Sequence, residues 1–242
     1  MTPDQYRQQR GQILLALYTA LEPLLRLLHS HPSDTEWRAF VEAAYPSVYR
    51  ARMDVWRLAR RFYGEERQRA VHRGNLVDFP RRNYSPADFD AALRERVKPA
   101  IDALDEGSPV PRVVVNEVAD IAERHADAGG REGIVDAARH DSLALGYARI
   151  TTGEKDCAFC LMLVSRGPVY KTASTALLRD GTSEPYHDNC DCIAVPVFNA
   201  ADWPGRDQYQ RWERAWREHG GDLNTWRRWI EHRDDEPAAA AA

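Results

Sequence analysis

Residues 5–29 read QYRQQRGQILLALYTALEPLLRLLH and set the character of the first part of the chain. Leucines recur there at intervals of three and four residues, which is the spacing of one face of an α-helix. Pro23 lies inside the stretch and predicts a kink or a split, because proline disrupts the helical hydrogen-bond pattern. The stretch therefore predicts an amphipathic helix with a buried leucine face.

The same periodicity continues outward over the first two-thirds of the chain. Ser33 or Asp34 is expected to cap a second helix that bends at Pro46, and Ser85 is expected to cap a third. The pair Gly129-Gly130 predicts a break between the last two helices of this region. The expected ranges of these further helices are 35–69, 86–106, 113–127 and 132–145.

The pattern changes after residue 145, where short strands are expected alongside helices. The strands are predicted at 147–152, 169–170 and 193–198, a short helix at 156–165, and a tryptophan-rich helix beyond 202 with a disordered tail after Asp234. The expected fold class is α+β, predominantly α. Three regions follow: a helical N-terminal region (1–108), a small α/β module with a Cys/His cluster (109–200), and a Trp-rich C-terminal helix with its tail (201–242).

Composition limits the class of protein. The 242 residues are 43% hydrophobic and 29% charged, with a net charge of −4, which are values of a globular chain. No apolar run is long enough to cross a membrane, and the polar first ten residues do not resemble a secretory signal, so we expect a soluble protein made in a cytoplasm. Residues 37–82 carry eleven arginines against five acids. The chain has thirty arginines against three lysines, which we interpret as a coding bias towards arginine, and a phosphate-binding face is the alternative.

All four cysteines gather near one histidine. The spacing is Cys157-x2-Cys160, then 26 residues, then His187-x2-Cys190-x-Cys192. Thiolate and imidazole are the ligands that zinc prefers in a closed tetrahedral site, and a helix N-terminus favours the thiolate form. The cluster therefore predicts a structural zinc.

Five candidate ligands compete for four positions. Residues i and i+2 of a strand lie about 7 Å apart, whereas two sulfurs on one zinc are at most about 4.6 Å apart. The preferred set is therefore Cys157, Cys160, His187 and Cys190, with Cys192 as the substitute. Packed thiols without metal and disulfides remain open, and a redox enzyme or a nucleic-acid-binding knuckle is less favoured.

The motif order resembles the Mu F-like phage minor head module, and more closely the minor capsid proteins of actinobacterial phages, some labelled capsid maturation proteases. The resemblance runs from Arg149-Ile150-Thr151-Thr152 through the cysteines to Val195-Pro196-Val197 and covers about 50 residues. It departs from the family at Asp188 and Asp191, where Pro and Arg are usual, so any role of that Arg is lost here.

The resemblance implies a virion protein of low copy number inside the capsid near the portal vertex, made in the host cytoplasm. It would bind the portal protein and the major capsid or scaffold protein, with packaged DNA as a further contact, and act in head assembly and genome packaging or ejection.

The alternative is an enzyme, a capsid maturation protease. His140-Asp141-Ser142 is the most suggestive local group, but neighbouring residues on a helix point in different directions and form no triad among themselves. A Cys–His protease using Cys157 and His187 is chemically feasible. No G-x-S-x-G or H-E-x-x-H motif is present, so no catalytic residue is assigned.

Overall fold

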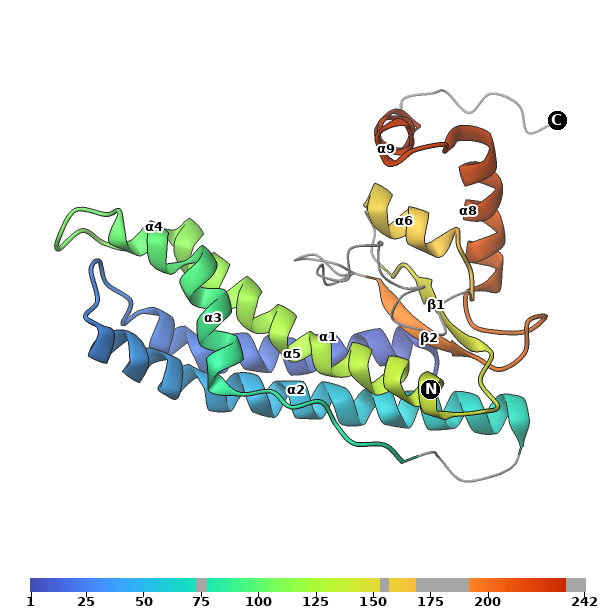
Figure 1. Cartoon of the computed structure of the whole chain (residues 1–242), viewed down its shortest axis with the longest axis horizontal. Coiled ribbons are helices and arrows are strands. Elements are labelled where there is room, and N and C mark those ends of the chain that lie inside the picture. Colours follow the sequence, from blue (N-terminus) through green and yellow to red (C-terminus); the bar gives the residue numbers. More distant parts are fainter. Residues whose placement is uncertain (73–77, 153–156, 169–191, 234–242) are drawn as a thin grey trace. The chain divides into compact units, whose positions relative to one another are not determined.

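The computed structural model describes residues 1–72, 78–152, 157–168 and 192–233 (Figure 1). Two compact units share these residues. Residues 5–62 and 78–133 belong to the first unit, and residues 2–4, 63–72 and the described residues from 134 onward belong to the second. Within the described ranges, no helix has both the length and the apolar character needed to span a membrane.

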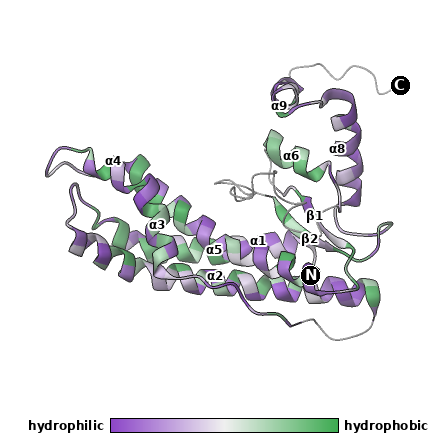
Figure 2. Cartoon of the chain, viewed as in Figure 1, coloured by the Kyte–Doolittle hydropathy of each residue, from purple (hydrophilic) through white to green (hydrophobic). Residues whose placement is uncertain are grey.

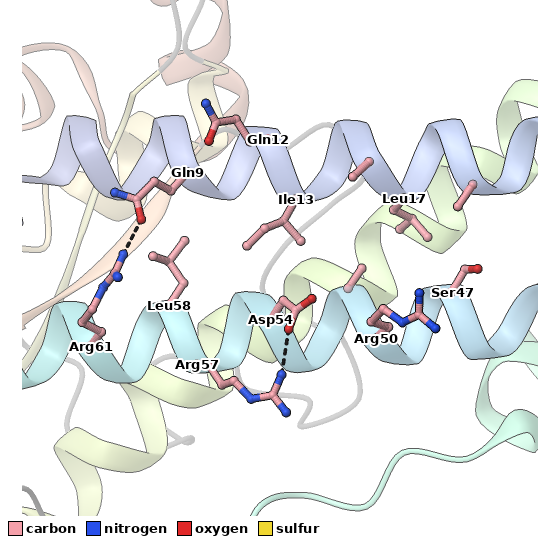
Figure 3. A pocket seen from close by; sticks show the side chains of 13 residues that line it. Gln9, Gln12, Ile13, Leu17, Ser47, Arg50, Asp54, Arg57, Leu58 and Arg61 are labelled. Carbon is pink, nitrogen blue, oxygen red and sulfur yellow. Dashed lines mark hydrogen bonds and ion pairs between the residues drawn. The ribbon is translucent and has the colours of Figure 1, made fainter.

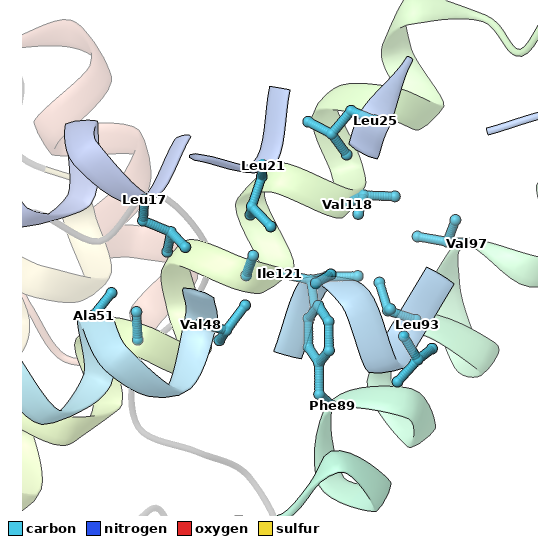
Figure 4. Close-up of a cluster of buried hydrophobic side chains, with 14 of the residues drawn as sticks. Leu17, Leu21, Leu25, Val48, Ala51, Phe89, Leu93, Val97, Val118 and Ile121 are labelled. Carbon is cyan, nitrogen blue, oxygen red and sulfur yellow. The ribbon is translucent and has the colours of Figure 1, made fainter. Parts of the chain in front are cut away.

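The first unit is helical. Its elements are α1 (Pro3–Leu25), α2 (Asp34–Val71), α3 (Pro86–Arg96), α4 (Lys98–Asp102) and α5 (Arg112–His140), of which α1, α2 and α5 extend into the second unit. Leu17 and Leu21 of α1 meet Val48 of α2, Phe89 of α3 and Ile121 of α5 in one core (Figure 4). The predicted leucine face of the first helix is therefore confirmed as a core-forming face.

Two of the helices begin at the caps that the sequence indicated. Ser33 precedes α2: its hydroxyl accepts a hydrogen bond from the Glu36 amide at 3.3 Å, and its own amide donates to the Glu36 carboxylate at 2.9 Å. Ser85 and Asp88 form the same reciprocal arrangement at the start of α3. Such boxes satisfy amides that the first helical turn leaves without partners.

The prediction of a break at Gly129-Gly130 is wrong, because α5 runs unbroken through both glycines. A Cβ at Gly129 would lie 2.3 Å from the Arg52 carbonyl oxygen, and one at Gly130 would lie 2.6 Å from Cγ1 of Val55. The glycines therefore allow α5 to approach α2 closely, and this packing outweighs their poor helix propensity. Pro46 lies inside α2, and the bend expected there stays a prediction.

A buried charge network crosses the first unit between α1 and α5. Asp127 forms ion pairs with Arg10 and Arg131, and all three side chains are nearly inaccessible. Burial disfavours ionisation of Asp127, but the two guanidinium groups outweigh it and hold the pKa of the carboxyl below its ordinary value. Burial also raises the pKa of the neighbouring Tyr6.

The second unit contains a two-stranded antiparallel sheet, β1 (Gly146–Ile150) and β2 (Ile193–Val197), in which Ala148 lies opposite Val195. Helix α6 (Ala158–Val164) packs on β1 and on two C-terminal helices, α8 (Arg206–His219) and α9 (Leu223–His232). Figure 2 shows α6 as mainly hydrophobic and α8 as mainly hydrophilic. The two strands and the helix confirm the short elements expected near 147–152, 193–198 and 156–165.

The C-terminal region differs from the single tryptophan-rich helix that was expected. Gly221, with φ 98°, separates α8 from α9, and the Asp222 carboxylate caps α9 by accepting from the Asn224 and Thr225 amides at 2.8 and 3.0 Å. The predicted strand at 169–170 and the predicted tail lie outside the described residues. The chain is thus predominantly helical with a small sheet, as predicted. The three domain ranges given above remain predictions.

Candidate metal centre

Three of the four cysteines converge in the second unit. Cys160 and Cys192 are 3% and 2% exposed, and Cys157 packs against them. They come from separate elements, because Cys157 and Cys160 stand at the start of α6 whereas Cys192 directly precedes β2. All three are free thiols. The contact between the C-x2-C pair and Cys192 brings together residues more than 30 positions apart in the sequence.

Cys157 is the N-cap of α6. Its Sγ accepts a hydrogen bond from the Cys160 amide at 3.2 Å, in the place where serine or aspartate usually accepts one. An amide donor and the positive end of the helix dipole both favour the thiolate over the thiol. Cys157 therefore has a structural role as the helix cap, whatever else its sulfur binds.

Arg149 supplies a positive charge beside this cluster. It is fully buried in β1, and its Nη1 donates to Cys192 Sγ at 3.7 Å. Arg149 lies opposite Ala194 in the sheet, so Cys192, two residues earlier, lies on the same face of the sheet as Arg149. A buried guanidinium needs an anionic or polar partner, and a thiolate is such a partner. From the sequence alone, Arg149 was notable only as part of the family motif, and its contact with Cys192 was not predicted.

The contact of Arg149 with Cys192 has one sign in the sequence, an arginine within an otherwise apolar strand. Tyr147, Ala148 and Ile150 surround Arg149 and are all buried. A charged residue among them indicates an internal partner, but the sequence alone does not say which.

The tryptophans of the C-terminal helices hold α6 in place. Trp226 is completely buried and its Nε1 donates to the Ala158 carbonyl oxygen at 2.7 Å. Trp212 and Trp216 pack edge-on against Trp226 with ring centroids 6.1 and 5.1 Å away. The helix that carries the C-x2-C pair is thus anchored at its first turn.

The remaining candidate ligands, His187 and Cys190, lie outside the described residues. The structure therefore places Cys157, Cys160 and Cys192 together and leaves the other two without a described position. Within the described ranges, no three or more Cys, His, Asp or Glu side chains form a group able to hold a metal ion. The three thiols are of the donor type that zinc prefers, and a zinc site on them stays a prediction.

The His140-Asp141-Ser142 group has a structural role. Asp141 is buried and accepts hydrogen bonds from Arg67 at 2.7 Å and from the Tyr63 hydroxyl at 3.1 Å. His140 Nδ1 lies 2.7 Å from the Asp136 carbonyl oxygen. Asp141 therefore links α2 to the end of α5 through Arg67 and Tyr63.

These features define a mainly helical α+β protein with a buried cluster of thiols. Residues 2–219 match the family described as VG15 protein, and the chain belongs to this family. It is 29% identical to the Gene 15 protein of Mycobacterium phage D29 over 216 residues, covering 78% of this chain and 76% of that protein. It is 28% identical to the Gene 15 protein of Mycobacterium phage L5, covering 89% and 84%. No solved structure matches the chain.

Family membership places the chain among phage proteins, as the resemblance implied. The matching family is VG15, so the resemblance to the Mu F-like module and the protease label stay predictions.

Proposed function

We propose that this chain is a phage minor capsid protein that acts in head morphogenesis, associated with the portal inside the capsid. The proposal rests on two observations taken together, the membership of a phage protein family and the presence of a motif that resembles the Mu F-like module. The chain belongs to a family with mycobacteriophage members, and the segments that resemble a Mu F-like module, β1, α6 and β2, lie in one compact unit.

The contacts of the thiols favour a structural role over catalysis. Cys160 and Cys192 are buried, Cys157 caps a helix, and Trp226 donates to the Ala158 carbonyl oxygen in the first turn of α6. A nucleophilic cysteine requires access for its substrate. A protein with this centre acts by binding, and its partners are the portal protein and the major capsid or scaffold protein.

Contact with packaged DNA is a further part of the proposal, restricted to exposed arginines. In the basic stretch 37–82, Arg52, Arg60 and Arg67 are buried and unavailable to phosphate. Other arginines of the stretch remain exposed. A measured salt dependence of DNA binding gives the number of phosphate contacts directly.

The decisive experiment for the assembly role locates the protein in particles. Purified virions and portal-containing procapsids are analysed by mass spectrometry, and the chain is expected in both at low copy number. Co-expression with portal, scaffold and major capsid proteins is expected to give co-purification with the portal and intact partners. Absence from particles contradicts the role. Specific truncation of scaffold that disappears in a Cys157→Ala variant of unchanged melting temperature would establish a protease.

We further propose one structural zinc ion, held by Cys157, Cys160, His187 and Cys190, with Cys192 as the substitute ligand. Elemental analysis of reduced protein is expected to give about one zinc per chain, since such sites close four-coordinate. Cys157→Ala or Cys160→Ala is expected to unfold the second unit, because binding and folding free energies are shared in small metal sites. Metal that strips without loss of fold argues for packed thiols instead.

A further inference from the structure

A groove runs between α1 and α2 in the first unit (Figure 3). Its volume is about 670 Å³. The apolar lining comes from Ile13, Ala16 and Leu17 of α1 and from Ala51 and Leu58 of α2. Ala16 and Ala20 are small and exposed, so they leave space where longer side chains would close the groove.

The two sides of the groove differ in charge. Helix α2 contributes Arg50, Arg57 and Arg61, with Asp54 as the acid among them, so this side carries a net positive charge. Helix α1 contributes the neutral side chains of Gln9 and Gln12.

Two of the three arginines already have partners within the groove. Arg57 pairs with Asp54 at 2.7 Å, and Arg61 donates to Gln9. Arg50 is exposed and makes no hydrogen bond or ion pair with the described residues. A ligand with negative charge along this side alone would match the groove.

The arginines also define a length and a period. Positions 50, 57 and 61 are spaced by seven and four residues, so they share one face of α2 and span about 16 Å, or three helical turns. The apolar lining is shorter, because on α2 it runs from Ala51 to Leu58, about 10 Å. A groove with an apolar floor is a common receptor for one face of an amphipathic helix.

We propose that this groove binds an amphipathic helix of a partner protein that carries an apolar stripe and a row of Asp or Glu residues along one flank. The acidic flank faces α2 and the neutral flank faces α1, which fixes the direction of the bound helix. The proposal rests on the assembly role proposed above and names the chemistry of one contact. Its charge pattern disfavours nucleic acid, because the groove floor is apolar and only one side is basic.

A pair of synthetic peptides tests this recognition on the full chain. Both are helical 15-residue peptides with leucines spaced three and four apart; one carries glutamates along one flank, and the other has lysines at the same positions. Fluorescence anisotropy is expected to show binding of the glutamate peptide, with at least about tenfold weaker binding of the lysine peptide. Equal affinity for the two peptides overturns the proposal.

Variants of the groove locate the binding. Ala16→Trp fills the groove and is expected to abolish binding, and Arg50→Glu is expected to weaken it at least about threefold, the size of one exposed ion pair. Ala39→Trp and Arg38→Glu are matched controls, since both residues are exposed on α2 outside the groove. Groove variants that fold, as judged by thermal melting, and bind as well as the wild type overturn the proposal.

Failure of this inference is distinguishable from failure of the assembly role. If Ala16→Trp protein enters particles and retains the portal as wild type does, the groove is not the docking site but the assembly role stands. If wild-type protein binds the glutamate peptide yet is absent from particles, the groove proposal stands alone. Self-association in sedimentation velocity that Ala16→Trp abolishes would make a second copy of the chain the occupant and overturn the partner-helix proposal.

Discussion

Replacement of Gly129 by alanine tests the close packing of α5 on α2. The added Cβ would lie 2.3 Å from the Arg52 carbonyl oxygen and 2.8 Å from Arg52 Cγ, so the two helices must separate by about 1 Å to restore an ordinary contact. Separation also disturbs the Arg52 guanidinium, which donates to the His125 carbonyl at 2.6 Å and to Glu132 at 2.5 Å. Overpacking costs about 3 kcal/mol at its upper end, against about 1 kcal/mol gained in helix propensity, for a net loss near 2 kcal/mol.

Gly11→Ala is the matched control. Gly11 lies inside α1 with nothing within 4 Å of an added Cβ, so the same substitution is expected to stabilise by about 1 kcal/mol. The two variants should therefore differ by about 3 kcal/mol, or about 6–12 °C in melting temperature for a chain of this size. Urea denaturation and calorimetry measure the difference. Equal effects of the two substitutions would refute the packing explanation for the glycines.

Three further variants have defined outcomes. Asp127→Asn should destabilise the protein by about 3–5 kcal/mol, since two buried arginines lose their anion. In the wild type the pKa of Asp127 is depressed, so its stabilisation is complete above about pH 4 and is lost as the pH falls through the lower pKa of the folded state. Urea unfolding between pH 7 and pH 2 measures this loss. Trp226→Phe should cost more than Trp229→Phe in the same assay, by about 0.5–1.5 kcal/mol, because it removes the hydrogen bond to the Ala158 carbonyl oxygen. Arg149→Met should lower zinc affinity about 10- to 100-fold in a chelator competition, and unchanged affinity would exclude a role for the buried guanidinium at the metal.

Periodicity and caps were sufficient to predict most of the helices. The leucine spacing of residues 5–29 and the capping residues Ser33 and Ser85 act locally, so the sequence alone indicates them. Gly129-Gly130 acts through a contact with residues nearly 80 positions away. Because glycine has a low helix propensity, a double glycine predicts a helix break. In this fold the two glycines instead allow α5 to approach α2 closely, which only the tertiary packing reveals.

The gathering of cysteines was predictable from the sequence, whereas its geometry was not. The C-x2-C spacing and the third cysteine indicate converging sulfurs, and the structure brings Cys157, Cys160 and Cys192 together. The sequence ranked Cys192 as the substitute ligand, because alternate residues of a strand lie too far apart to share one ion. Its contact with Arg149 was not foreseeable, since it depends on the register of β1 against β2.

The abundance of arginine and its placement have separate explanations. The chain has thirty arginines against three lysines, and a coding bias would not account for the arginines inside the protein. Arg52 and Arg60 are buried with their guanidinium carbons 4.5 Å from the Tyr84 and Phe79 ring centroids. Guanidinium is more weakly hydrated than ammonium and stacks on aromatic rings, so it tolerates such burial where lysine does not. A part of the basic stretch is therefore core, and the charge available to a partner is concentrated in exposed residues such as Arg50 at the groove.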